Sequence, residues 1–304
     1  MPSLQHAVAA KVIPIIRRNP PADDVPALRA ALVERNRTAD DGPPKGVRQG
    51  HEEQISNDRG FPVFTLWKPT PGGEAPRRSV VYLHGGAYVR GIVGWHWRFL
   101  VPLADALGAR AVLPAYPLAP EYTVEDSFEE MVQLVADVVA ESPGGVVLAG
   151  DSAGGGYALA VAEALRDRGG PQVDCLVLLA PWVDLTGSAP GTLEAAERDP
   201  WLSHEHLSIY ASFWAGSEDP AALADPTVSP GLGDLTGLPP ALMFCGTRDL
   251  LQPGCDELFE RADAADWSLE YVVAPGLIHV YPLLPIPEGK AARQHIEDFC
   301  RAEI

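Results

Sequence analysis

The sequence predicts an α/β fold with a mostly parallel eight-stranded sheet flanked by helices, and two observations lead to this prediction. Apolar or alternating runs of strand length recur along the chain, and stretches with apolar residues at helical spacing separate most of them. Strands that alternate with helices pair in parallel and are buried on both faces. With 304 residues, of which 46% are hydrophobic, the chain can bury one large domain.

The expected elements are given in chain order. Helices are expected at 3–18 and 24–37, because Asn19-Pro20-Pro21 between them would end a helix, and a polar linker at 40–46 follows. Strands are expected at 47–56, 61–67, 79–83, 110–115, 145–149, 173–180, 239–245 and 268–273, the first two as an antiparallel edge hairpin. Further helices are expected at 97–108, 125–141, 153–168, 251–265 and 288–301. The region 184–228 breaks this alternation, since it has two helical stretches and no strand.

One short motif indicates a nucleophile. Gly150-Asp151-Ser152-Ala153-Gly154 fits the pattern G-x-S-x-G, follows a predicted strand and opens a predicted helix. A serine on so sharp a strand-to-helix turn is pushed out of the sheet with its hydroxyl exposed, and only small residues fit around it. The pattern also occurs in phosphate-binding and plain turns, so Ser152 needs a base and an acid further along the chain.

His279 is the candidate base. It follows the apolar run 268–273 and a predicted turn at Pro275-Gly276, so it lies at a strand end, where catalytic groups of open α/β sheets gather. His295 lies instead in the predicted terminal helix. In α/β-hydrolases the chain order is serine, acid, histidine, which His279 satisfies.

Asp249 is the candidate acid, because it leaves the predicted strand just before the one that delivers His279. An aspartate at this position could simply cap the helix that begins near Leu251. Asp184 is the main rival, since it also leaves a strand. Asp256 and Glu257 fall inside the helix and point away from a strand-end site.

A glycine-rich run completes the predicted site. His84-Gly85-Gly86-Ala87 follows a predicted buried strand, and loops of this type in lipases and esterases supply backbone N–H groups for an oxyanion. The candidate donors are Gly85, Gly86 and Ala87, together with Ala153 after the serine. We expect His84 to orient the loop.

These motifs resemble the hormone-sensitive-lipase-like family of bacterial esterases from about residue 60 to the end. Two departures are Ala87, where the family usually has a third glycine, and Pro117, where it often has arginine. The resemblance implies a catalytic triad of Ser152, Asp249 and His279. The matching segments are HGGAY at 84–88, YPLAPE at 116–121, GDSAGG at 150–155, DPTVSP at 225–230 and GTRD at 246–249.

The family context also predicts a cap. An insertion between strands of this fold is where lids form, so residues 1–45 and the insertion at about 184–228 are expected to cover the catalytic domain at 46–304. Such a cap favours short- to medium-chain acyl esters, because extra carbons beyond the pocket wall gain no burial. The candidate substrate-binding residues are Tyr88, Trp95, Trp97 and Trp214.

Composition limits the partners. The formal net charge of −18 argues against nucleic acid and anionic membranes and is typical of a cytoplasmic protein. The four cysteines show no C-x-x-C spacing and His204 and His206 suit no zinc site, so we expect neither metal nor cofactor. Lys11 and Pro14 interrupt the apolar N-terminal stretch, so no signal peptide or anchor is expected. The expected partner is a small-molecule ester, and a homodimer is compatible with the sequence.

The resemblance implies a serine carboxylesterase that acts through an acyl-enzyme. Two alternatives stay open. A lactone hydrolase would use the same triad, because the triad does not select its substrate. A non-catalytic small-molecule receptor would resemble a plant hormone receptor of this family that lacks the histidine, whereas this chain has His279.

Overall fold

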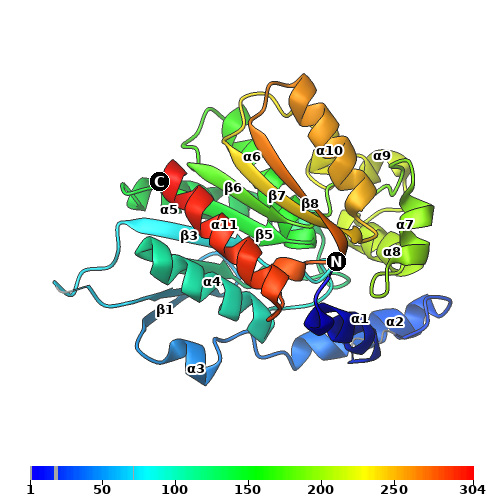
Figure 1. Ribbon diagram of the computed structural model, residues 1–304, viewed down its shortest axis with the longest axis horizontal. Helices are drawn as coiled ribbons and strands as arrows, with labels where there is room; N and C mark the ends of the chain where they lie inside the picture. Colours follow the sequence, from blue (N-terminus) through cyan, green and yellow to red (C-terminus); the bar gives the residue numbers. More distant parts are fainter. Residues whose placement is uncertain (1, 17–19, 71) are drawn as a thin grey trace.

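The computed structural model describes residues 2–16, 20–70 and 72–304, and its centre is one eight-stranded sheet (Figure 1). The strand order is β1-β2-β4-β3-β5-β6-β7-β8. β1 pairs with β2 and β2 with β4 in antiparallel fashion, and the remaining pairs are parallel. The strands are β1 (Glu52–Ser56), β2 (Val63–Trp67), β3 (Arg78–Leu83), β4 (Ala109–Pro114), β5 (Val146–Asp151), β6 (Cys175–Leu179), β7 (Ala241–Arg248) and β8 (Leu269–Ile278). The predicted fold class is therefore confirmed.

Helices cover both faces of the sheet. α4 and α11 pack together on one face, and α5 and α6 pack together on the other (Figure 1). Every residue of β5 and β6 is buried, which explains why these strands are almost continuously apolar. The helices that flank the sheet are α4 (Gly94–Leu107), α5 (Phe128–Glu141), α6 (Ala153–Asp167), α10 (Gln252–Ala264) and α11 (Pro287–Glu303).

Two expectations about strand boundaries are wrong. The strand expected from residue 47 begins at Glu52, because the short helix α3 (Lys45–Arg48) comes first. The turn expected at Pro275-Gly276 does not occur, since β8 continues to Ile278 across an irregularity in its pairing with β7. Gly276 adopts a φ of 77° there and donates its N–H to the Thr247 hydroxyl, so the irregular strand keeps its backbone bonded. His279 consequently lies directly at the strand end.

The N-terminal helices α1 (Leu4–Ile16) and α2 (Val25–Arg37) lie against the edge of the molecule where β8 ends (Figure 1). The buried His6 on α1 accepts a hydrogen bond from the N–H of Ile278, the residue before His279, at 3.1 Å. Burial is the largest influence on His6 and lowers its pKa, which keeps the accepting nitrogen unprotonated. The backbone that carries His279 is thus tied to the first helix.

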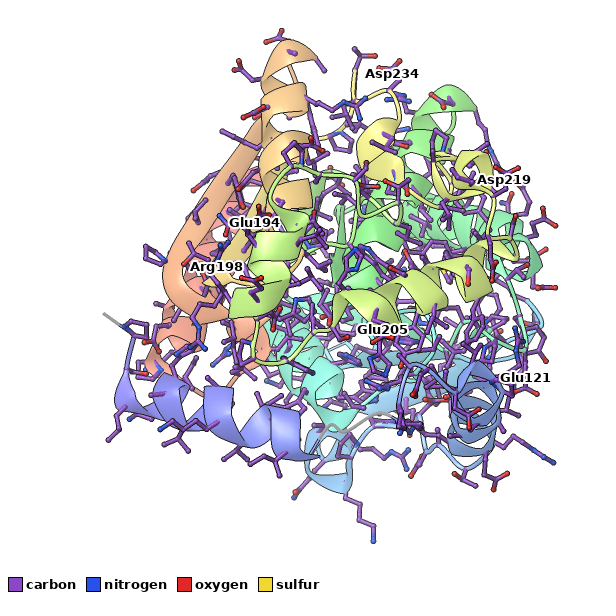
Figure 2. The ribbon with its side chains drawn as sticks, turned by 90° about the vertical axis from the view of Figure 1, so that its right-hand side faces the viewer. Glu121, Glu194, Arg198, Glu205, Asp219 and Asp234 are labelled. Carbon is purple, nitrogen blue, oxygen red and sulfur yellow. The ribbon has the colours of Figure 1, made fainter. Side chains whose placement is uncertain are left out.

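The insertion at 184–228 folds as three helices, where two were expected: α7 (Thr192–Arg198), α8 (His204–Ala215) and α9 (Pro220–Leu223). Figure 2 shows Glu194 and Arg198 on α7 and Glu205 on α8 at its outer surface. The opposite side of α8 is apolar and buried. The His206 ring donates to the carbonyl of Pro20, which joins the insertion to the N-terminal segment. Among the described residues, no helix is long and apolar enough to cross a bilayer.

Candidate active site

Ser152 occupies the sharp turn between β5 and α6. Its φ of 52° and ψ of −124° are strained for a residue with a side chain, as the predicted motif requires. The glycines around it are required by close approach. A Cβ on Gly154 would lie 2.0 Å from the Leu83 carbonyl oxygen, and one on Gly150 would lie 2.3 Å from that of Gly154. The turn therefore holds the serine hydroxyl above the carboxyl end of the sheet.

Three side chains form a hydrogen-bonded chain at this end of the sheet. The Ser152 hydroxyl donates to Nε2 of His279 at 2.9 Å, and Nδ1–H of His279 donates to Oδ2 of Asp249 at 2.8 Å. All three side chains are buried. The other oxygen of Asp249 accepts from the N–H of Leu251 at 2.9 Å. One carboxylate thus both accepts a hydrogen bond from the backbone just before α10 and contacts His279.

The rival residues lie elsewhere. Asp184 uses both carboxylate oxygens within its own loop, where it accepts from Thr186 and Ser188. His295 on α11 pairs with Glu270 at the surface. Asp256 sits inside α10, as expected, and accepts from a tyrosine hydroxyl on β8. None of these contacts involves Ser152 or His279.

The charges around His279 favour its protonated form. Burial alone lowers the pKa of the imidazole, but the carboxylates of Asp249, Asp199 and Asp151 outweigh this effect, and the pKa is raised above its usual value. The result is a stronger base than an ordinary histidine. The Asp249 hydrogen bond also fixes the tautomer that leaves Nε2 free to accept a proton.

The glycine-rich run 84–87 follows β3 and lines the cavity beside Ser152. One expected donor is already engaged, because the N–H of Gly85 donates to Oδ1 of Asp151 at 2.8 Å. That hydrogen bond instead anchors the loop to the residue before the serine. Gly86 and Ala87 have positive φ values of 125° and 54°, so the backbone turns tightly here. A side chain on Gly86 would collide with the Arg90 carbonyl oxygen at 2.6 Å.

His84 acts on the loop structurally, as expected. Its Nδ1–H donates to the carbonyl of Gly85 at 2.8 Å, and its ring stacks on Tyr116 at 4.3 Å. The Tyr116 hydroxyl in turn donates to the His84 carbonyl at 2.6 Å. Burial lowers the pKa of His84 to about 3, so its ring stays neutral.

A cavity of about 140 Å³ opens onto Ser152 and His279. Of the four aromatic residues expected to bind substrate, only Trp95 lines it. Trp97 is fully buried and donates to the Asp41 carbonyl. Because both tryptophans lie on α4 two positions apart, they point to different sides of the helix. Tyr88 and Trp214 stack on each other at 4.2 Å within the core, so the substrate-binding assignments of Tyr88, Trp97 and Trp214 are wrong.

Two further residues at this site are not among those that the sequence motifs predict. Trp201 lines the cavity, and the centre of its ring lies 5.4 Å from that of the His279 ring in an edge-to-face arrangement. Asp199 lies beside Asp249, where burial and the Asp249 charge raise its pKa to about 6. Both belong to the loop between α7 and α8, which no strand-end rule could place. Ile13 brings α1 into the cavity wall, and Leu202, Leu207, Leu283 and Leu284 add aliphatic surface to it.

The described residues include no group of three or more histidine, cysteine, aspartate or glutamate side chains arranged to hold a metal ion. The four cysteines are buried and free. Cys175 and Cys245 lie in the buried strands β6 and β7. Their place in the core explains their residue type without a chemical role.

Known proteins share the fold of this chain and part of its sequence. Residues 80–283 match a family described by its α/β-hydrolase fold. An acetyl-hydrolase of Streptomyces hygroscopicus is 34% identical over 230 residues, covering 74% of this chain and 75% of that protein. The carboxylesterase NlhH of Mycobacterium tuberculosis is 31% identical over 232 residues, covering 73% and 71%.

Solved structures agree with this relationship. An esterase from the bacterial hormone-sensitive lipase family superimposes with a TM-score of 0.77 at 29% identity, covering 100% of this chain and 99% of that one. The esterase EstE5, in crystals soaked with p-nitrophenyl butyrate, superimposes with a TM-score of 0.78 at 26% identity, covering 99% of both chains. This chain is therefore an ester-hydrolysing member of the α/β-hydrolase family, in its bacterial hormone-sensitive-lipase-like branch.

Proposed function

We propose that the protein is a serine carboxylesterase in which Ser152, His279 and Asp249 form the catalytic triad. The observation that supports this most directly is the unbroken chain of hydrogen bonds from the Ser152 hydroxyl to the Asp249 carboxylate. A serine hydroxyl becomes a useful nucleophile only when a base removes its proton, and a carboxylate keeps that base in the required tautomer.

In the proposed reaction the Ser152 oxygen attacks the ester carbonyl carbon while His279 Nε2 takes the hydroxyl proton. The tetrahedral intermediate collapses to an acyl-enzyme as the imidazolium gives this proton to the leaving alcohol. His279 then removes a proton from water, which attacks the acyl carbon, and the acid is released with Ser152 regenerated. Asp249 stabilises the imidazolium in both steps and is itself not protonated.

The proposed oxyanion hole consists of the backbone N–H groups of Gly86, Ala87 and Ala153. Gly86 and Ala87 lie in the tight loop beside Ser152, and Ala153 is the first residue of α6, where N–H groups are free and the helix dipole is positive. Gly85 takes the different role of holding the loop to Asp151. Donors of this kind stabilise the negative oxygen that forms in each tetrahedral intermediate.

We further propose that residues 1–45 and the insertion at 184–228 act as a cap and restrict the enzyme to short- and medium-chain acyl esters. Ile13 from α1 and Trp201 from the insertion both line the cavity of about 140 Å³, which supports a pocket closed by the two segments. The acetyl-hydrolase name of one relative and the p-nitrophenyl butyrate soak of EstE5 agree with small acyl groups.

The test is a panel of p-nitrophenyl esters of rising acyl length, with a lactone and an emulsified triglyceride alongside. We expect kcat/KM to rise from acetate to butyrate or hexanoate and then to fall, because each buried methylene contributes about 0.8 kcal/mol only until the chain meets the wall. A preference for long-chain esters would contradict the proposed cap. Preference for the lactone would move the assignment to a lactone hydrolase with the same triad.

A further inference from the structure

One buried carboxylate of the insertion reaches the loop of the proposed catalytic acid. Asp199 follows α7, and its Oδ1 accepts hydrogen bonds from the N–H groups of Trp201 and Leu202 at 2.7 and 2.9 Å. Its Oδ2 accepts from the N–H of Leu250 at 2.7 Å, and Leu250 directly follows Asp249. A single side chain therefore connects the insertion to the end of β7.

We propose that Asp199 is a positioning residue of the esterase site, which holds Trp201 and the Asp249 loop in place and adds a buried carboxylate next to the proposed triad. The inference rests on the proposed triad. In this proposal the insertion both forms part of the cavity wall and supports the residues of the triad. Asp199 touches neither the reacting atoms nor Ser152, so it acts through its neighbours.

The choice of an aspartate here is informative. A backbone N–H can be capped by serine or asparagine without introducing a charge. Asp199 instead places a second carboxylate next to Asp249 in a buried site, where both burial and the neighbouring charge oppose its ionisation. With its pKa raised to about 6, the carboxyl is still mainly ionised at neutral pH. The nearby His279 is the group that gains from this charge.

Three acidic side chains influence His279, each from a different element: Asp249 at the end of β7, Asp199 from the insertion and Asp151 at the end of β5. Asp199 is in turn influenced by Asp249 and His279. Hydrolysis requires His279 unprotonated in the free enzyme and protonated in the intermediates. A charge that favours the imidazolium therefore makes His279 a stronger base and moves the acidic limb of the pH profile upward.

The variant Asp199→Asn tests this inference, because it keeps the side-chain shape and removes the charge. We measure kcat and KM for p-nitrophenyl butyrate between about pH 4.5 and 9, where the acidic limb of kcat/KM reports the base. The expected results are a shift of this limb to lower pH and a fall in kcat at its plateau of about tenfold, with a smaller change in KM, since one buried hydrogen bond is also lost.

Asp184→Asn is the matched control, because Asp184 is a buried aspartate of the same insertion that also accepts backbone hydrogen bonds but does not face His279. Its acidic limb should stay where the wild-type limb is. Asp199→Ser, which keeps one hydrogen-bond acceptor without charge, provides a second variant if the asparagine variant does not fold. Melting temperatures of all variants are recorded alongside.

The outcomes separate the inference from the proposed function. A fall in activity with the acidic limb unmoved in both Asp199 variants would make Asp199 a purely structural residue and overturn the inference, as would wild-type behaviour of both. If wild-type hydrolysis does not depend on Ser152, the proposed triad fails and there is no His279 limb to compare.

Discussion

The strand-end loops and the added helices contribute to this site in different ways. Ser152, Asp249 and His279 follow β5, β7 and β8, which run parallel within one sheet, so these residues leave the sheet at the same edge. Much of the cavity wall instead comes from α1, from α4 and from the insertion, which are separated in sequence and are not joined by the hydrogen bonds of the sheet. Sheet hydrogen bonds hold the strand-end set (Ser152, Asp249 and His279) in narrowly defined positions. The residues of the cavity wall, the cavity set, can change without disturbing the sheet.

The largest effect is expected from the strand-end set. Ser152→Ala should lower kcat/KM for p-nitrophenyl butyrate by about 10⁴-fold or more, because the proposed acyl-enzyme forms on the hydroxyl that this variant removes. The fold should persist, since alanine retains the Cβ that this backbone conformation already accommodates. Activity assays with a melting curve check this, and substantial residual turnover in a pure, folded sample would remove Ser152 from its proposed role.

Asp249→Asn should also be severe, with a loss of about 10⁴-fold in kcat, because the amide favours the wrong tautomer of His279. The matched variant Asp184→Asn, in the insertion, should retain most activity, since the Asp184 carboxylate accepts its hydrogen bonds within its own loop. Parallel steady-state kinetics of the two variants decide between them. The reverse pattern, with Asp184→Asn inactive and Asp249→Asn mild, would show that Asp184, and not Asp249, is the acid of the triad.

The strand-end set is also the part whose proximity follows from sequence rules, and the structure brings its three side chains together. Ser152 and Gly154 follow a local steric rule, because the turn excludes side chains, and such a rule is readable from five adjacent residues. Asp249 and His279 follow from the chain order of the fold and the position of buried strands. The turn wrongly predicted at Pro275-Gly276 does not affect the placement of His279, since the longer β8 ends at Ile278, directly before it.

The cavity set could not be predicted in the same way. Trp95 and Trp97 are two residues apart on α4, and only the helix orientation decides that one lines the cavity while the other enters the core. Trp201 and Asp199 depend on where the insertion folds back over β7, which is a contact between distant segments. Gly85 shows a further limit, because its hydrogen bond to Asp151 cannot be read from the motif.

A smaller, selective effect is expected for Trp201→Ala. Removing this ring enlarges the cavity, so the ratio of kcat/KM for hexanoate over acetate should rise by about tenfold. This factor corresponds to the free energy of burying one or two methylenes. Trp97→Phe is the comparison, because Trp97 is buried in the core, and it should lower the melting temperature while leaving the acyl preference unchanged. An acyl preference that changes in Trp97→Phe and not in Trp201→Ala would contradict the assignment of Trp201 to the cavity wall.

The smallest expected effect concerns the scaffold alone. Glu163 lies on α6, the helix that begins just after Ser152, and its side chain is buried between this helix and the segment at Gly233. Within the described part of the chain, its Oε1 has no hydrogen-bond partner. Burial, only partly opposed by Arg166, raises its pKa to about 9. The side chain is therefore neutral in the folded protein at neutral pH.

The sign of its effect on stability follows from this shift. The folded state keeps the Glu163 proton up to about pH 9, whereas the unfolded chain loses it near the ordinary glutamate pKa of about 4.5. Between these values the folded state binds more protons, so stability decreases as pH rises through this window. Glu163→Gln removes this dependence and should raise the melting temperature by a few °C at about pH 8, with little change at pH 4. Glu194→Gln, at the outer surface of α7 (Figure 2), is the control and should change neither value. Esterase activity at pH 7 should be unaffected by both variants, and a lower melting temperature of Glu163→Gln at pH 8 would mean that the carboxylate is paired in the folded protein.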